Sequence, residues 1–217
     1  MSHQSALIFG PGNSFSFELA QQFHEHDYEV GLIGRDGQSM ERLGKKLDDA
    51  GIPHYSAYAD VRSGSELENA MQDIAANLPP WKAIIHNVKY SPHGDALSIA
   101  PKELTESLNV NVVSLQRIAR LAVYEWARHP DASLLVSGGG YKDAPVEDKI
   151  ALATSKGALH SFCLALQETM QDYSVDVKEV VIDGWVDPKG DFTPQQTAQY
   201  FWRVHDSKPY GTYTLRR

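Results

Sequence analysis

The chain has 217 residues, of which 42% are hydrophobic and 22% are charged, and its formal net charge is -8. This length and apolar content predict one globular domain over residues 1–217 with a sizeable core, since no linker or internal repeat divides the sequence. The negative net charge argues against nucleic acid as a main partner, and the lack of an apolar run of about 18 to 20 residues argues against a membrane span.

Short apolar runs alternate with longer amphipathic segments along the chain. The predicted strands lie at 5–10, 28–34, 54–61, 82–87, 133–138, 175–183 and, as a candidate edge strand, 211–216. The predicted helices lie at 14–26, 37–50, 63–78, 101–127 and 146–173, with a short last helix from 193. This alternation predicts an α/β fold, a doubly wound parallel sheet of the Rossmann type with helices on both faces. Such a sheet binds its ligand at the carboxyl ends of its strands.

Two local patterns mark helix starts. Ser63-Gly64-Ser65-Glu66 is a capping box, in which the Ser63 side chain accepts from a backbone N–H of the first turn while Glu66 reaches back to the start. Pro101 suits a first helical position because it has no N–H to leave unpaired.

The first strand leads into Gly10-Pro11-Gly12, a turn that lets the backbone approach a phosphate closely. Asn13 and Ser14 could donate hydrogen bonds to that phosphate at the start of the next helix. Phe15 belongs to the same turn and is included in the predicted cofactor site, although its ring is expected to pack the helix against the sheet.

The ends of the second and third strands bear on the choice of cofactor. In dinucleotide-binding folds an acid after the second strand binds the adenine-ribose hydroxyls, whereas an arginine there can meet a 2′-phosphate. Gly34 stands in the acid's place and Arg35 follows, which favours NADP over NAD. Asp36 weakens that preference, because it could pair with Arg35 or bind a ribose itself. After the third strand, Asp60 and Val61 could contact the adenine, or Asp60 could simply help to start the next helix.

Six motifs, in this order, resemble those of the short-chain dehydrogenase/reductase family. They are the glycine turn at 10–16, Gly34-Arg35, Asp60-Val61, His86-Asn87-Val88, Val110-Asn111 and Ser155-Lys156-Gly157-Ala158. The resemblance implies the strand order 3-2-1-4-5-6-7 and hydride transfer between NADP(H) and a small carbonyl compound or alcohol. It implies that Asn87 closes a turn over the adenosine, that Asn111 holds a water and a helix kink, and that Lys156 binds the nicotinamide ribose. Gly184 and Val186, after the sixth strand, are also expected at the cofactor.

The same resemblance points to two missing catalytic groups. The family uses a tyrosine four residues before the lysine as general acid, and a serine about a dozen residues earlier to hold the carbonyl oxygen. Leu152 and Gly139 stand at those positions here, while Lys156 and Asn111 are retained. We therefore expect a substitute proton donor, with Tyr141 as the catalytic candidate beside Lys156 and Asn111.

Other candidate donors are Tyr90, His93, Ser137 and Lys156 itself, if burial lowers its pKa. His86 is expected to pack at its strand end rather than to act as a base. No spacing of histidine, cysteine and carboxylate residues indicates a metal site.

Two classes of function remain open at this stage, besides a scaffold that no longer binds any nucleotide, which Ser14 and Ser16 in the glycine turn would suggest. One is an NADP-dependent oxidoreductase with an unusual active site, and the alternative is an inactive nucleotide-binding protein that acts as a sensor or interaction module. Helices 101–127 and 146–173 resemble the pair that forms the family's dimer interface, so we expect a homodimer or tetramer, although deep burial in one subunit would also explain their apolar residues. The single cysteine, Cys163, and the lack of a signal peptide predict a cytoplasmic protein.

Overall fold

The computed structural model describes all residues except 1–3, 13, 130, 208 and 217. A seven-stranded sheet forms its centre, in the order β3-β2-β1-β4-β5-β6-β7, and every pairing is parallel. The strands are β1 (Ser5–Phe9), β2 (Glu29–Gly34), β3 (His54–Tyr58), β4 (Trp81–His86), β5 (Ala132–Ser137), β6 (Val175–Ile182) and β7 (Gly211–Leu215). The expected strand order is confirmed, and the candidate edge strand at 211–216 is present as β7.

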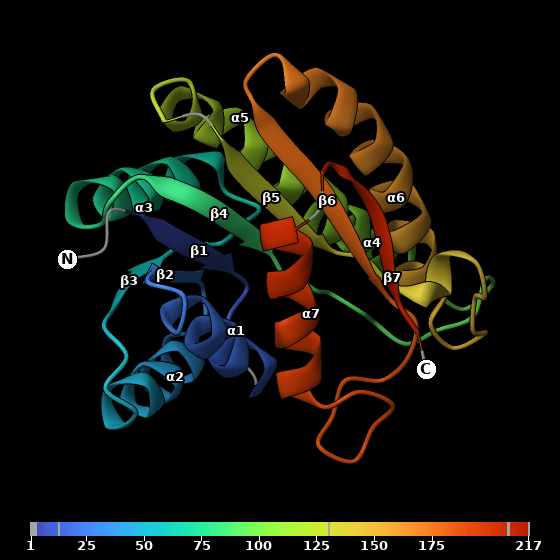
Figure 1. Cartoon of the computed structure of the whole chain (residues 1–217). Coiled ribbons are helices and arrows are strands. Elements are labelled where there is room, and N and C mark those ends of the chain that lie inside the picture. Colours follow the sequence, from blue (N-terminus) through green and yellow to red (C-terminus); the bar gives the residue numbers. More distant parts are fainter. Residues whose placement is uncertain (1–3, 13, 130, 208, 217) are drawn as a thin grey trace.

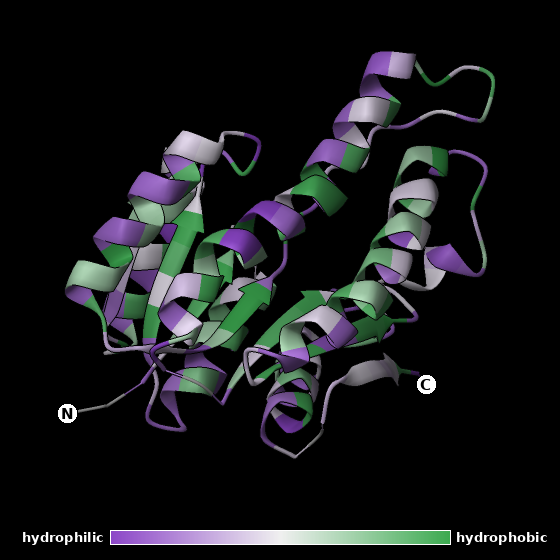
Figure 2. Ribbon diagram, turned by 90° about the horizontal axis from the view of Figure 1, so that it is seen from above, coloured by the Kyte–Doolittle hydropathy of each residue, from purple (hydrophilic) through white to green (hydrophobic). Residues whose placement is uncertain are grey.

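Helices cover both faces of this sheet (Figure 1). One face carries α1 (Ser14–His24), α2 (Gly37–Asp49) and α7 (Pro194–Ser207). The other carries α3 (Gly64–Asn77), α4 (Pro101–Leu108), α5 (Ser114–Trp126) and α6 (Ile150–Gln171). Seen from above, the strands are largely hydrophobic and the helices show hydrophilic residues on the outside (Figure 2). In the described part of the chain, no helix is both long and apolar enough to cross a membrane.

β1 shows why these runs become central strands. All five of its residues are buried, with Ala6 and Ile8 packed on one side of the sheet and Leu7 and Phe9 on the other. Side chains alternate between the faces of a strand, so only a continuously apolar run satisfies two covered faces. Full burial of one such side chain contributes about 1.5 to 3 kcal/mol.

β6 departs from this rule, because it carries two adjacent charged residues in its middle. Lys178 points toward α7, where its Nζ donates to the carbonyl oxygen of His205 at 2.7 Å. Glu179 points toward α6, where its carboxylate lies 2.5 Å from Nδ1 of His160. Both charged side chains are almost completely buried, so each depends on its partners for solvation.

The helix expected over 101–127 is interrupted by a π-helical turn at Asn109–Val113. The Ser114 N–H bonds the carbonyl oxygen of Asn109 across this wide turn. Asn111 sits inside it, where its buried carboxamide reaches the backbone of Tyr90. The kink expected at Asn111 is therefore present, and the extra residue in the turn is what brings its side chain to the loop after β4.

Two other expected boundaries are wrong. The helix expected from residue 146 begins at Ile150, because residues before it pair with another loop: Gly94 N–H donates to the carbonyl oxygen of Asp148 at 3.1 Å. The strand expected over 54–61 ends at Tyr58, where the chain turns toward α3.

The capping box is present in part. The Ser63 side chain accepts from Glu66 N–H at 3.3 Å, as expected. The Glu66 carboxylate, however, accepts from Asp60 N–H at 2.9 Å rather than from Ser63 N–H, which already donates to the carbonyl oxygen of Asp60. Glu66 therefore fixes the end of β3 to the start of α3.

Gly10 provides a test of the turn after β1. Its φ is 74°, and a Cβ built there would lie 2.8 Å from the carbonyl oxygen of Asn87. We expect Gly10→Ala to lower the free energy of unfolding by about 1 to 3 kcal/mol, because it adds backbone strain and a contact with backbone atoms. Urea denaturation measures this. Gly64→Ala is the matched control, since nothing lies near its Cβ position; equal stability of the two variants would contradict the assignment.

Candidate active site

A cavity of about 290 Å³ opens at the carboxyl ends of the strands at the centre of the sheet. It is lined by Gly10, Pro11, Gly12, Gly34, Arg35, Asp36, Ser39, Ala59, Asp60, Val61, Arg62, Val88, Lys89, Tyr90, Glu106 and Val110. Five predicted cofactor-binding residues are thus brought together: Gly10, Gly12, Arg35, Asp60 and Val61. The volume is near the lower end of the range for small-molecule sites, about 300 to 1,000 Å³.

The glycine turn forms one wall of the cavity. Gly10 N–H donates to the carbonyl oxygen of Ile33, which ties the turn to the end of β2. Ser14 is exposed at the first position of α1, and Asn13 lies outside the described residues. Phe15 is buried and its ring meets that of Phe201 edge to face, with 5.3 Å between centroids, so it packs α1 against α7. Phe15 is absent from the residues that line the cavity.

Arg35 and Asp36 make contacts with different residues in the structure. Asp36 caps α2: its carboxylate accepts from the hydroxyl of Ser39 at 2.6 Å and from Ser39 N–H at 3.4 Å. These hydrogen bonds lower the pKa of Asp36. Arg35 is 61% exposed and lies 3.7 Å from Asp60 instead. The sequence left open whether Asp36 pairs with Arg35, and the structure gives that pairing to Asp60.

Asp60 is held mainly by a residue that the sequence analysis did not single out. Arg62 donates to both carboxylate oxygens of Asp60, and its Nη1 also bonds Glu106 on α4. The hydrogen bonds from Arg62 lower the pKa of Asp60 to about 2, and Arg35 adds to the effect. Arg62 directly follows the Asp60-Val61 motif, so its place beside the cavity could have been read from that spacing.

Asn111 is buried next to Val110, which lines the cavity, and its carboxamide is fully hydrogen-bonded. Its Oδ1 accepts from Tyr90 N–H, and its amide donates to the carbonyl oxygen of Tyr90, both at 2.8 Å. The same amide lies within hydrogen-bond distance of the Ser107 and Ser155 hydroxyls, at 3.0 and 2.8 Å. Asn111 therefore joins α4, the loop after β4 and α6 at a point one residue before Lys156.

Lys156, on α6, is buried and is not among the residues that line the cavity. Its Nζ donates to the carbonyl oxygen of Ser137, at the end of β5, at 2.5 Å. Burial lowers the pKa of Lys156 to about 8, and the negative charge of Glu179 opposes the shift. An ammonium with a pKa close to neutrality can both carry charge and release a proton.

Asn87 and His86 complete the end of β4. The Asn87 side chain accepts from the Ser137 hydroxyl at 3.0 Å, which joins the ends of β4 and β5. His86 is buried, lies 2.7 Å from the Ser114 hydroxyl, and has its pKa lowered to about 3, chiefly by burial. A neutral, enclosed imidazole fits the packing role expected for His86.

Leu152 and Gly139 stand close to Lys156. Leu152 is buried one turn before it on α6. A Cβ built at Gly139 would lie 3.6 Å from Cε of Lys156 and meet nothing closer. Tyr141 is half-buried in the 3-10 turn Gly140–Lys142 that follows. Of the other candidate donors, His93 pairs with Asp148 at 3.2 Å on the exterior.

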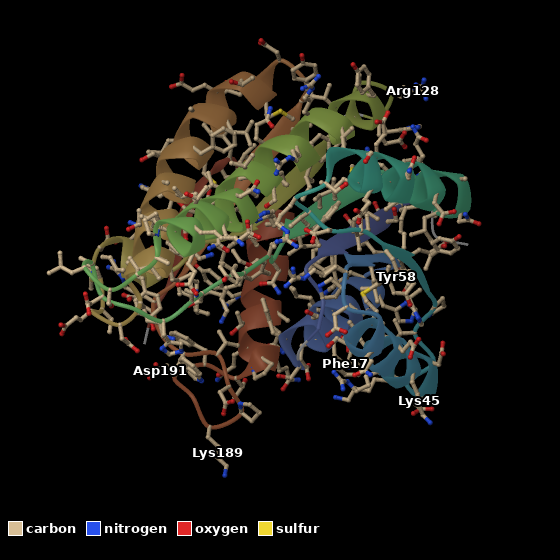
Figure 3. The ribbon with its side chains drawn as sticks, turned by 180° about the vertical axis from the view of Figure 1, so that it is seen from behind. Phe17, Lys45, Tyr58, Arg128, Lys189 and Asp191 are labelled. Carbon is tan, nitrogen blue, oxygen red and sulfur yellow. The ribbon has the colours of Figure 1, made fainter. Side chains whose placement is uncertain are left out.

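Gly184 and Val186 lie in the loop between β6 and α7, away from the residues that line the cavity. The labelled Lys189 and Asp191 mark this loop, and Lys189 projects away from the body of the molecule (Figure 3). The loop is closed on itself, since Trp185 N–H donates to the Asp191 carboxylate at 2.8 Å and Val186 bridges to Phe192. Among the described residues, no group of histidine, cysteine and carboxylate side chains could hold a metal ion.

Comparison with known proteins identifies the family. The family model described as short chain dehydrogenase matches residues 4–189. The chain belongs to the short-chain dehydrogenase family. It is 24% identical over 187 residues to DltE, an uncharacterized oxidoreductase of Bacillus subtilis, across 83% of this chain and 71% of that protein.

Solved structures of short-chain dehydrogenases share the whole fold. One from Mycobacterium smegmatis superposes with a TM-score of 0.90 at 12% identity, covering 100% of this chain and 92% of that one. A metagenomic short-chain oxidoreductase in complex with NADP superposes with a TM-score of 0.87 at 16% identity, covering 99% and 97%.

The burial of Lys156 gives a pH-dependent prediction. Its folded-state pKa of about 8 lies below its usual 10.5, so the unfolded chain binds more protons between these values and stability rises with pH there. We expect the stability of Lys156→Met relative to the wild type to increase by about 1 to 3 kcal/mol as the pH falls from 10 to 7, because the wild type alone must bury the charged ammonium at the lower pH. Urea denaturation across this range measures it.

Lys45→Met is the control, because Lys45 extends into solvent from α2 (Figure 3). Its stability relative to the wild type is expected not to change with pH. A Lys156→Met variant that is less stable than the wild type by the same amount at every pH would contradict the prediction.

Proposed function

We propose that the chain is an NADP(H)-dependent oxidoreductase that transfers hydride to or from the carbonyl or alcohol group of a small molecule. The preference for NADP over NAD rests on the different contacts that Arg35 and Asp36 make. Arg35 lines the cavity with an exposed guanidinium, whereas Asp36 is held by Ser39 as the cap of α2. An exposed arginine beside an engaged acid suits a 2′-phosphate better than free ribose hydroxyls.

The cavity residues fit the adenosine half of the cofactor. Gly10 and Gly12 let the backbone approach a diphosphate, and the start of α1 presents N–H groups toward it. Val61 and Asp60 lie where an adenine ring would pack, with Asp60 held in place by Arg62. Asn87 and Ser137 fix the adjoining strand ends. Ser14, the first residue of α1, is proposed to belong to the same phosphate site, as is Asn13, which lies outside the described residues. Gly184 and Val186 are proposed to contact the far end of the cofactor.

NADPH, when bound, supplies the hydride that adds to the carbonyl carbon. In the reduction, the carbonyl oxygen must take up one proton as the hydride arrives, which yields the alcohol. We assign that proton to the Lys156 ammonium, which becomes a neutral amine and is protonated again from solvent. Its pKa of about 8 leaves it mostly charged at neutral pH and still able to release the proton. Asn111 and Ser155 fix the start of α6 from which it extends.

A second candidate is a nucleotide-binding protein without turnover, acting as a sensor or interaction module. Leu152 favours it, because an apolar buried side chain stands where the family has its tyrosine acid. Loss of one general acid typically lowers a rate by about 10² to 10⁴, which weakens an enzyme without abolishing it. Lys156 and its supporting hydrogen bonds are retained, so we rank turnover first.

The whole chain is proposed to act as one domain within a homodimer or tetramer. Val113 in the π-helical turn before α5, Tyr124 on α5 and Leu164 on α6 are exposed apolar side chains, which suits an interface formed by this part of the molecule. Cys163 is a buried free thiol, which suits the reducing cytoplasm.

Cofactor binding is the first test. Titration of the cofactor-free protein is expected to give tighter binding of NADPH than of NADH. Arg35→Ala is expected to weaken NADPH binding by at least about tenfold and leave NADH binding unchanged, because it removes a charge-assisted hydrogen bond to the phosphate. Arg203→Ala, on the exposed side of α7, is the charge-matched control. Equal affinity of the wild type for NADPH and NADH would contradict the proposed preference for NADP.

Turnover is tested with a panel of carbonyl compounds and NADPH. We expect slow reduction that is lost in Lys156→Ala and kept in Tyr141→Phe; loss in Tyr141→Phe alone would move the proton donor to Tyr141. The double variant Gly139→Ser, Leu152→Tyr separates the second candidate. A serine fits at 139, because its Cβ makes only ordinary contacts with Lys156. Activity that appears only in the double variant would favour a protein without turnover.

A further inference from the structure

A carboxylate is buried close to Lys156 in a layer that is otherwise apolar. Glu179 is completely inaccessible to solvent and lies on the face of β6 that packs against α6. Val175 and Val177 share that face and belong to the hydrophobic core there. An ionised carboxylate in such a layer is costly unless hydrogen bonds and an opposite charge compensate it. The cost of burying Glu179 therefore suggests that its carboxylate has a specific role.

The hydrogen bonds of Glu179 leave one of its oxygens unused. Oε2 lies 2.5 Å from Nδ1 of His160 and accepts from the Thr212 hydroxyl on β7 at 3.3 Å. Oε1 has no hydrogen-bond partner among the described residues. It lies beside Gly138, where a Cβ would come within 2.8 Å of it. The absence of a side chain at 138 is what leaves room for the carboxylate.

α6 presents three ionisable groups toward this carboxylate. Lys156, His160 and Cys163 follow one another at the spacing of a single helix face. The negative charge of Glu179 raises the pKa of Lys156 against the effect of burial, and it also contributes to the raised pKa of the Cys163 thiol. Lys156 Nζ donates to the carbonyl oxygen of Ser137, and the Glu179 carboxylate lies against the next residue, Gly138. The two groups are therefore close together, although they share no hydrogen bond in the described residues.

The remaining groups near Lys156 do not supply this negative charge. The thiolate of Cys163 would also raise the pKa of Lys156, but burial raises the pKa of the Cys163 thiol, which keeps it neutral. Lys89, in the loop after β4, lowers the pKa of Lys156 further. His86, on β4, is neutral because its own pKa is lowered to about 3. Ser137 offers a carbonyl oxygen, which accepts one hydrogen bond but carries no net charge. Glu179 is the nearby anion.

We propose that Glu179 is a positioning residue whose buried negative charge keeps Lys156 protonated, and that His160 holds its carboxylate in place. The use of this charge in catalysis rests on the proposed function, because there Lys156 donates the proton. The electrostatic coupling itself is a property of the cofactor-free chain. It can therefore be measured with neither cofactor nor substrate present.

The experiment follows the titration of Lys156 by NMR in protein labelled with ¹³C and ¹⁵N at lysine, with Lys156→Met to assign the signal. The wild-type midpoint is expected near pH 8. Glu179→Gln keeps the size of the side chain and removes its charge, and we expect the midpoint to fall by roughly one pH unit or more, a tenfold loss of proton affinity. An unchanged midpoint in folded Glu179→Gln overturns the proposal.

Three further variants make the test specific. Glu168→Gln removes an exposed carboxylate from the same helix and is expected to leave the midpoint at its wild-type value; an equal shift there would show a non-specific charge effect and overturn the proposal. His160→Leu removes the side chain that holds Glu179 and should also lower the midpoint. His160→Gln, which can still donate to the carboxylate, should restore it. Because His160 is 28% exposed, these two variants serve if Glu179→Gln does not fold.

The outcome separates this inference from the proposed function. A lowered midpoint in Glu179→Gln together with no reduction of any carbonyl compound would support the coupling and reject the enzymatic proposal. Reduction that depends on Lys156, with no effect of Glu179→Gln on the midpoint, would support the enzymatic proposal and reject the coupling.

Discussion

The carboxamide of Asn111 is the point at which three separate parts of the chain meet. Its Oδ1 accepts from Tyr90 N–H, and its two amide hydrogens are shared among the carbonyl oxygen of Tyr90 and two serine hydroxyls, one on α4 and one on α6. A buried amide that lost these partners would cost about 1 to 3 kcal/mol for each group left unpaired, so the arrangement resists partial change. The hydrogen bond to Ser155 fixes the start of α6, and with it the backbone from which the Lys156 side chain extends. The placement of Lys156 relative to the loop after β4 thus depends on one hydrogen-bonded side chain.

The charged groups of β6 show how the sheet tolerates ions in its interior. Lys178 reaches the last turn of α7, and Glu179 reaches α6, so neighbouring residues serve opposite faces. Each is anchored to a different helix by a short hydrogen bond. The strand therefore ties the two helical layers to one sheet through polar contacts, in addition to its apolar packing. Buried ions of this kind contribute to specificity of packing more readily than to net stability.

Much of the fold could be predicted because its signals are local and repeated. Continuous apolar runs such as Ser5–Phe9 predict strands covered on two faces, and the alternation with helices predicts the parallel sheet. The cavity followed from the same reasoning, since glycine turns and charged residues stand where parallel strands end. Arg35 and Asp60 were both expected there, and both line it.

The features that were missed depend on contacts distant in sequence. The family resemblance implied a kink at Asn111, but the π-helical form of the turn at Asn109–Val113 reflects the pairing of Asn111 with Tyr90, and helical periodicity does not reveal such a contact. The late start of α6 reflects pairing of Asp148 with Gly94. For Glu179 a signal did exist, because a charged pair inside an apolar strand contradicts burial on both faces. Its partner His160 could not be chosen among nine histidines without the register of α6 on β6.

The wide turn at Asn109–Val113 also constrains how this chain can change in length. A helix advances by about 100° per residue, so winding the same residues as a regular α-helix would rotate the whole of α5 relative to α4 by that angle. The buried residues of α5, Leu115 and Trp126 among them, would then be turned from the sheet. Deleting one residue of the turn would leave a regular helix with α5 in place, but it would remove the wide turn that holds Asn111 against Tyr90. The wide turn, by taking up the extra residue, thus keeps the buried side of α5 facing the sheet.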